Sequence, residues 1–234
     1  MAESSSQVAG AEPAPQPTPL FETAILASLG AAVLALLLFA WLGSEVLEGE
    51  TQHFDQVIRE WVHTFASPGM TRAMTAVSLL GYNVLIAELA ITLAVFAWLR
   101  WRRAALWLVI AMTGSLVLDL TLKYIYHRTR PTAYFGTAPH SYSFPSGHAL
   151  CSFCFYGVLA GLLSARTKPL LWRLLIWFAA AALIIAIGLS RIYLGVHYPS
   201  DVVAGYLAAT VWVGAIIVLD HVRKLRKSSK QKTA

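Results

Sequence analysis

Three short polar segments interrupt a chain that is otherwise almost continuously apolar. They span residues 123–131, 145–148 and 190–201. Together they contain three fixed cations, two histidines and one carboxylate, namely Lys123, Arg130, Arg191, His148, His197 and Asp201. A phosphoryl group in transfer spreads its charge over its equatorial oxygens, so catalysis needs several cations and hydrogen-bond donors that converge. The three segments therefore predict an enzyme that binds and transfers a phosphoryl group.

The cations and the small residues near them define a candidate phosphate site. Lys123, Arg130 and Arg191 supply positive charge, and the planar fork of arginine matches the geometry of phosphate. We expect Ser146 to cap the start of a helix, where Gly147 permits close backbone approach and free N–H groups add donors. The alternative is that these Lys and Arg side chains only extend from a membrane edge into the interface. That alternative does not explain why three cations accompany paired histidines.

The two histidines have different expected roles. His197 and Asp201 are four residues apart, so a helical segment would place them on one face. Neutral His197 could attack phosphorus while Asp201 fixes its tautomer and stabilises the charged ring. His148 could then protonate the leaving oxygen. The alternatives are interfacial histidines bonded to loop carbonyls, or a zinc site; nearby cations would repel a metal, so we expect neither metal nor other cofactor.

The composition places these segments in a membrane protein. The chain is 57% hydrophobic and 13% charged, whereas about a quarter of the residues of a soluble domain are charged. Six apolar stretches approach the ~20 residues that span a bilayer. They cover residues 23–42, 73–99, 104–125, 148–164, 170–190 and 202–220. We therefore predict an all-α fold, a six-helix transmembrane bundle.

Three regions follow from the composition along the chain. Residues 1–20 are rich in Ala, Pro, Ser and Gln; such a segment cannot bury enough apolar area to become ordered, so we expect a disordered tail. This tail lacks the basic region of a signal peptide, which makes the first apolar stretch a retained membrane helix. Residues 21–222 form the predicted membrane domain, and residues 223–234 form a basic tail.

The segment 54–65 has apolar side chains at helical spacing and charged side chains elsewhere around the helix. It predicts an amphipathic interfacial helix lying on the membrane surface. The alternative is a cap over the helix bundle.

The distribution of basic residues predicts the orientation. Twelve of the 18 Lys and Arg residues lie on one side of the predicted bundle: Arg100, Arg102, Arg103, Arg166, Lys168, Arg173, Arg223, Lys224, Arg226, Lys227, Lys230 and Lys232. The positive-inside rule makes this side cytoplasmic, together with both termini. The position of the basic tail after a membrane span favours anionic lipid over nucleic acid as its contact. The three polar segments then fall on the outer side, which predicts an outward-facing active site.

The three segments resemble the signature of the type 2 phosphatidic acid phosphatase superfamily. The patterns are Lys-x6-Arg-Pro, Pro-Ser-Gly-His and Ser-Arg-x5-His-x3-Asp, in this order. The resemblance covers about residues 50–220 and implies six spans and a phosphohistidine intermediate on His197, oriented by Asp201. It also implies that His148 is the acid and that the phosphate ligands are Lys123, Arg130, Ser146, Gly147 and Arg191.

The expected function is therefore that of an integral membrane phosphatase acting on lipid phosphate monoesters or diphosphates, such as phosphatidate, phosphatidylglycerol phosphate or polyprenyl diphosphate. The alternative is a lipid phosphotransferase that passes the phosphoryl group to an alcohol. We expect a bacterial inner membrane location with the site on the periplasmic face. Two further acids lie within the apolar stretches: Asp119 is expected to be a counter-ion for Lys123, and Glu88 has no evident partner.

Overall fold

The computed structural model describes residues 19–82 and 84–232, and every regular element in these ranges is helical. The elements are α1 (Pro19–Glu48), α2 (Gln52–His63), α3 (Pro68–Leu79), α4 (Leu85–Trp98), α5 (Arg102–Tyr126), α6 (Gly147–Ser152), the π-helical turn η1 (Phe153–Gly157), α7 (Val158–Ser164), α8 (Leu170–Tyr193) and α9 (Pro199–Lys232). The predicted all-α fold is confirmed. Residues 1–18 of the predicted disordered tail lie outside the described residues.

Five helical segments are long and apolar enough to cross a membrane. They are Leu26–Glu48, Arg102–Tyr126, Gly147–Ser164, Leu170–Tyr193 and Pro199–Arg223. Each corresponds to one of the six predicted apolar stretches. The chain is therefore a multi-pass membrane protein, in which α9 continues through residues 223–232 of the predicted basic tail.

The remaining predicted stretch, 73–99, is divided in the structure between α3 and α4. The 14 residues of α4 fall short of the ~20 that span a bilayer. The break surrounds Gly81, where a Cβ atom would lie 2.5 Å from Ile187 and 3.0 Å from His148. Both halves are apolar, so hydropathy alone did not reveal the break between them.

The break also explains the position of Glu88. The Tyr156 hydroxyl, on the π-helical turn η1, donates to Glu88 Oε2 at 2.6 Å and lies 3.1 Å from the Leu80 carbonyl oxygen. Tyr156 thus joins the interrupted α3–α4 segment to the helix that follows His148. The sequence offered no partner for Glu88, because the two residues are 68 positions apart.

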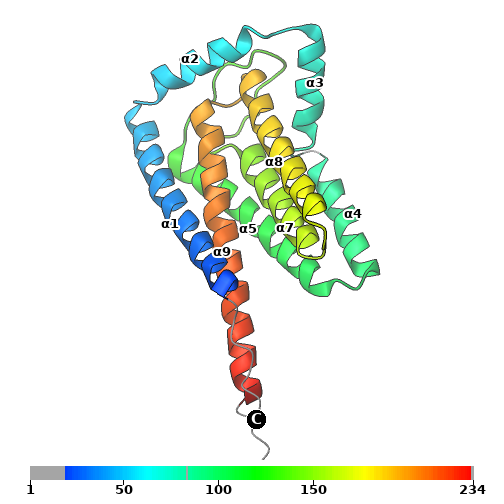
Figure 1. Cartoon of the computed structure of the whole chain (residues 1–234). Coiled ribbons are helices and arrows are strands. Elements are labelled where there is room, and N and C mark those ends of the chain that lie inside the picture. The colour runs from blue at the N-terminus through cyan, green and yellow to red at the C-terminus, as the bar shows by residue number, and fades with distance from the viewer. Residues whose placement is uncertain (1–18, 83, 233–234) are drawn as a thin grey trace, which may run out of the picture.

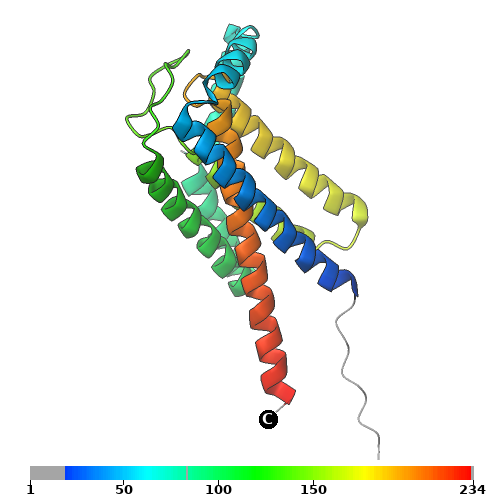
Figure 2. The same ribbon diagram turned by 90° about the vertical axis from the view of Figure 1, so that its left-hand side faces the viewer.

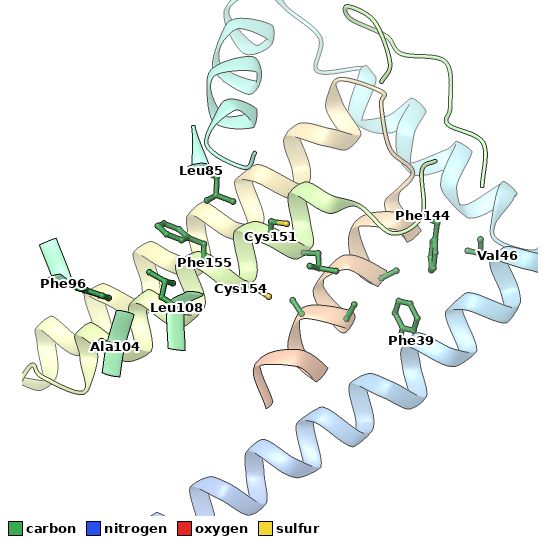
Figure 3. Packing of buried hydrophobic residues seen from close by; sticks show 14 residues of the cluster. Phe39, Val46, Leu85, Phe96, Ala104, Leu108, Phe144, Cys151, Cys154 and Phe155 are labelled. Carbon is green, nitrogen blue, oxygen red and sulfur yellow. The ribbon is translucent and has the colours of Figure 1, made fainter. Parts of the chain in front are cut away.

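The helices enclose one main apolar core. In both views α1 runs beside α9, and the start of α1 and the end of α9 lie at the same end of the molecule (Figure 1, Figure 2). Figure 3 shows Phe39 of α1 beside Phe144, with Leu108, Cys154 and Phe155 deeper in the cluster. Burial of these side chains stabilises the bundle.

Basic residues gather at the end of the bundle opposite the three polar segments. Arg103 forms an ion pair with Asp220. The Arg166 guanidinium lies 4.1 Å from the Trp101 ring centroid, and that of Arg223 lies 5.5 Å from Trp107. Arg103, Arg166 and Arg223 thus lie on the side of the fold to which the sequence assigned the larger number of basic residues.

Helix α2 crosses the other end of the bundle (Figure 1). Its charged residues Asp55 and Arg59 are buried, whereas Phe54, Val57 and Trp61 are exposed. The face that packs on the protein therefore carries Asp55 and Arg59 together with the buried Val62, as expected for a cap over the bundle. The exposed apolar face leaves the predicted contact with a membrane surface open, and that contact stays a prediction.

Candidate active site

The helices bring the three polar segments to one end of the bundle. Lys123 lies in the last turn of α5, and Arg191 lies in the last turn of α8. His148 belongs to the first turn of α6, and Asp201 to the first turn of α9. Arg130 stands in the loop after α5, and His197 in the turn between α8 and α9. All the predicted site residues thus lie at helix ends or in the loops that join them.

The turn that carries His197 is fixed against the loop after α5. Gly195 has φ +76°, in the left-handed region that glycine adopts readily. A Cβ atom there would lie 2.6 Å from the Tyr134 backbone nitrogen, whose N–H donates to the Leu194 carbonyl at 3.0 Å. A side chain at position 195 would separate the loop from the turn.

His197 and Asp201 meet, although not on one helical face as predicted. Because α9 begins at Pro199, His197 lies in the turn before the helix. Its Nδ1 is 3.3 Å from Asp201 Oδ2. The same carboxylate oxygen accepts the Tyr198 N–H at 2.8 Å and the Ser143 hydroxyl. In the bond to Tyr198, the side chain at the third position of α9 accepts the backbone N–H of the residue before the helix, as in a capping box. This bond brings the Asp201 carboxylate close to His197, which directly precedes Tyr198.

The hydrogen bonds of His197 define its tautomer. Arg130 Nη1 lies 2.9 Å from His197 Nε2. A guanidinium only donates, so Nε2 accepts and is unprotonated, and the ring proton is on Nδ1 facing Asp201. His197 is 1% exposed, and this burial lowers the pKa of His197 to about 4, against the opposing effect of Asp201. The ring is therefore neutral at pH 7, with the Nε2 lone pair directed at Arg130.

Arg130 is held in place by the loop around it. Its guanidinium donates to the carbonyl oxygens of Ser141 at 2.7 Å, Val196 at 2.8 Å and Tyr142 at 3.2 Å. It also donates to the Ser141 hydroxyl at 3.0 Å. These bonds fix the cation beside His197 Nε2.

Arg191 and Lys123 each have donors left for an anion. Arg191 is buried and donates to the Ser78 hydroxyl, while its Nε has no partner among the residues that the structure describes. Lys123 Nζ lies 2.8 Å from Asp119 Oδ2, which confirms the expected counter-ion. A lysine has three N–H donors, so this bond leaves capacity for a phosphate oxygen.

The start of α6 places His148 among the cations. Ser146 caps this helix, accepting the Ala149 N–H at 3.5 Å as predicted. At Gly147 a Cβ atom would lie 2.7 Å from Asp119 Oδ1, so the close approach that the structure shows there is to Asp119. The His148 ring stacks on Tyr82 with centroids 5.4 Å apart. The charged groups that interact with the His148 ring are Arg191, His197, Lys123 and Arg130.

Two charged residues that sequence reasoning did not include in the site also reach it. Arg128 lies 2.7 Å from Asp201 Oδ1 and 2.7 Å from Asp55 Oδ2. Arg128 belongs to the first polar segment and Asp55 to the predicted amphipathic helix. Their contact links positions 73 apart, and nothing in the local spacing signals it.

The fold and the site together define a helical membrane protein with several cations gathered around a neutral histidine. A family model described as the PAP2 superfamily matches residues 104–224, just over half of the 234 residues. The chain therefore belongs to the PAP2 superfamily, as its three polar segments predict.

Several known proteins are similar to this chain. The chain is 29% identical over 180 residues to phosphatidylglycerophosphatase B of Bacillus subtilis (strain 168), covering 74% of this chain and 87% of that protein. It is 31% identical over 125 residues to an undecaprenyl-diphosphatase of Sulfolobus acidocaldarius, covering 51% of this chain and 56% of that protein. A crystal structure of a transmembrane PAP2 type phosphatidylglycerolphosphate phosphatase from Bacillus subtilis matches with a TM-score of 0.74 and 26% identity, covering 81% and 96% of the two chains. These relatives are phosphatases.

Proposed function

We propose that this protein is an integral membrane phosphatase that hydrolyses lipid phosphate monoesters or diphosphates through a phosphohistidine on His197. The observation that carries the proposal is the placement of neutral His197 between Arg130 and Asp201. Only a neutral imidazole with an oriented lone pair can act as the nucleophile. The names of the relatives, which include a phosphatidylglycerophosphatase and an undecaprenyl-diphosphatase, support the substrate class.

In the first step, the phosphoryl oxygens bind Lys123, Arg130 and Arg191, with Ser146 and Gly147 beside them. A phosphate oxygen replaces His197 Nε2 as the acceptor of the Arg130 N–H, which frees the lone pair. Nε2 then attacks phosphorus, so that an N–P bond forms while the bond to the leaving oxygen breaks. Protonated His148 gives its proton to that oxygen, and Asp201 stabilises the positive ring of phosphorylated His197.

In the second step, water attacks the phosphorus and the N–P bond breaks. His148, now neutral, accepts the proton of the water molecule, as microscopic reversibility requires. Inorganic phosphate leaves, and His197 returns to its neutral state. An alcohol in place of water would give phosphotransfer instead; hydrolysis is proposed because the related proteins are phosphatases.

The position of the site supports a substrate anchored in the bilayer. It lies at the ends of membrane-spanning helices, where Tyr124 and Trp61 are exposed and suit the interface between water and acyl chains. Tyr193, at the end of α8, is buried and does not contribute to this interface. A lipid tail left in the bilayer anchors the substrate by roughly 0.8 kcal/mol per buried methylene. We propose that this end faces the periplasm of a bacterial inner membrane, with both termini cytoplasmic.

A phosphate-release assay on the purified protein tests this function. The panel contains phosphatidate, phosphatidylglycerol phosphate, a polyprenyl diphosphate and glucose 6-phosphate in one detergent, each with and without EDTA. We expect a much higher kcat/KM for the lipids and no loss of activity in EDTA, because Lys123, Arg130 and Arg191 supply the charge stabilisation. Equal kcat/KM for glucose 6-phosphate would overturn the lipid assignment. Activity that is lost in EDTA and restored by a divalent ion would overturn metal independence.

A further inference from the structure

Arg128 lies between two fully buried carboxylates. Its Nη1 is 2.7 Å from Asp201 Oδ1, and its Nη2 is 2.7 Å from Asp55 Oδ2. Asp201 comes from α9, whereas Asp55 comes from α2, so one guanidinium joins these helices. Buried charges are stable only when they are paired and hydrogen-bonded. Both carboxylates therefore depend on Arg128.

Further hydrogen bonds fix the geometry of this contact. Asp55 accepts the Ser200 N–H at 2.9 Å and the Ser200 hydroxyl at 2.6 Å. Arg128 donates to Ser200 Oγ at 2.7 Å and to Thr51 Oγ1 at 3.0 Å. Its guanidinium also lies 4.1 Å from the Tyr198 ring centroid. The first turn of α9, which carries Asp201, is thus held from α2 as well as from the bundle.

The net charge of Arg128, Asp201 and Asp55 affects His197. Arg128 is bonded to Asp201 Oδ1, while Oδ2 of the same carboxylate faces His197 Nδ1. With Arg128 alone, the charge of Asp201 would be neutralised. With Asp55 on the other side of the guanidinium, the group of three keeps one net negative charge.

We propose that Arg128 and Asp55 are positioning residues for the catalytic pair His197–Asp201. Arg128 fixes the orientation of the Asp201 carboxylate toward the His197 ring, and Asp55 offsets the charge of Arg128 so that the carboxylate still stabilises the positive ring. This inference rests on the proposed role of His197 as nucleophile. It assigns to α2 a part in catalysis besides covering the end of the bundle.

The other charged groups around His197 are the same in every variant of the test below. They are Arg130 on the loop after α5, Arg191 on α8 and His148 on α6. Changes at positions 55 and 128 therefore alter only the contribution of these two charges to the electrostatic potential at His197.

The test measures the pH dependence of kcat/KM for one lipid phosphate. Protonation of His197 lowers kcat/KM at acidic pH, which gives the pH profile its acidic limb. Asp55→Asn removes a negative charge, so His197 is harder to protonate and this acidic limb moves to lower pH. Arg128→Gln removes a positive charge, so the limb moves to higher pH. In each variant we expect kcat to fall by about ten- to a hundredfold because the nucleophile is less well oriented. The double variant restores the net charge, so its limb returns to the wild-type position while kcat stays low.

Matched controls separate this effect from a general disturbance. Glu60→Gln changes an exposed acid on α2 itself, and Arg103→Gln removes a cation from an ion pair at the other end of the bundle. Both controls are expected to keep the wild-type profile. Asp55→Glu and Arg128→Lys keep the charges, so their limbs stay in place even if kcat falls. Thermal unfolding in detergent shows which variants are folded.

The outcomes distinguish this inference from the proposed function. If Asp55→Asn and Arg128→Gln keep the wild-type limb and kcat while His197→Ala is inactive, the inference is wrong and the proposed function stands. If the limbs of both variants move in the same direction, the pair serves only folding and the inference is again wrong. If His197→Ala keeps its activity, the proposed function itself fails.

Discussion

Arg130 Nη1 lies 2.9 Å from His197 Nε2, on the side of the ring opposite the Nδ1 that faces Asp201. This cation lies against the lone pair that the proposed reaction uses. A bound phosphate would take over the Arg130 donor and expose the nucleophile at the same time. The arrangement links substrate binding to release of the attacking atom.

Replacement of Arg130 tests this link. Arg130→Lys keeps the charge but cannot reproduce the four donor contacts to Ser141, Tyr142 and Val196 together with the contact to His197 Nε2. We expect kcat/KM to fall by about a hundredfold or more, as for loss of one donor that stabilises a transition state. Steady-state kinetics on a lipid phosphate measure this. A variant within a factor of about three of wild type would show that the fork geometry is not required.

Burial of His197 predicts a pH-dependent stability. Its pKa is lowered to about 4 in the folded protein, whereas an unperturbed histidine has a pKa of about 6.5. Between these values the unfolded chain binds a proton that the folded protein does not bind, so stability falls as the pH falls. This contribution is about 1.4 kcal/mol per pH unit within the window.

The measurement is the thermal unfolding midpoint in detergent between pH 7 and pH 4.5. The decrease should be smaller in His197→Gln, which has no titratable group at this position. Equal decreases in the two proteins would contradict the assignment of a buried, neutral His197.

Gly147 allows Asp119 to approach the start of α6. A Cβ atom there would lie 2.7 Å from Asp119 Oδ1, so Gly147→Ala must displace the counter-ion of Lys123. We expect strong loss of activity, measured as phosphate release. Gly69→Ala is the matched control, because a Cβ atom at Gly69 meets no atom within 4 Å. Activity of Gly147→Ala equal to that of Gly69→Ala would show that the approach is unimportant.

The proposed orientation can be tested by labelling a single engineered cysteine. Thr137 lies in the loop after α5, at the same end as His197, and both natural cysteines are buried. In intact cells Thr137→Cys should react with a membrane-impermeant thiol reagent, since we place this end outside. A cysteine introduced at Lys168, between α7 and α8, should react only after the cells are opened. The reverse pattern would invert the topology.

The sequence was most informative where the chemistry is local. Ser146 caps α6 and Lys123 pairs with Asp119 as predicted, because each pair is separated by three or four residues. The apolar stretches predicted the membrane helices for the same reason, since hydropathy is a property of consecutive residues.

Contacts between distant parts of the chain could not be predicted in this way. The close packing at Gly81 involves Ile187, and the buried Asp55 is paired with Arg128 and bonded to Ser200. The amphipathic pattern of segment 54–65 put its apolar side chains on one face, whereas the structure buries Val62 together with Asp55 and Arg59. Only the packed structure brings these partners together.

Trapping of the phosphoenzyme tests the central claim most directly. The purified protein is mixed with a lipid phosphate carrying ³²P in its terminal phosphoryl group, and the reaction is stopped in alkali, in which phosphohistidine survives. We expect label on the wild-type protein and on His148→Ala when the substrate has a good leaving group, and none on His197→Ala. Label retained on folded His197→Ala would contradict the assignment of His197 as the nucleophile.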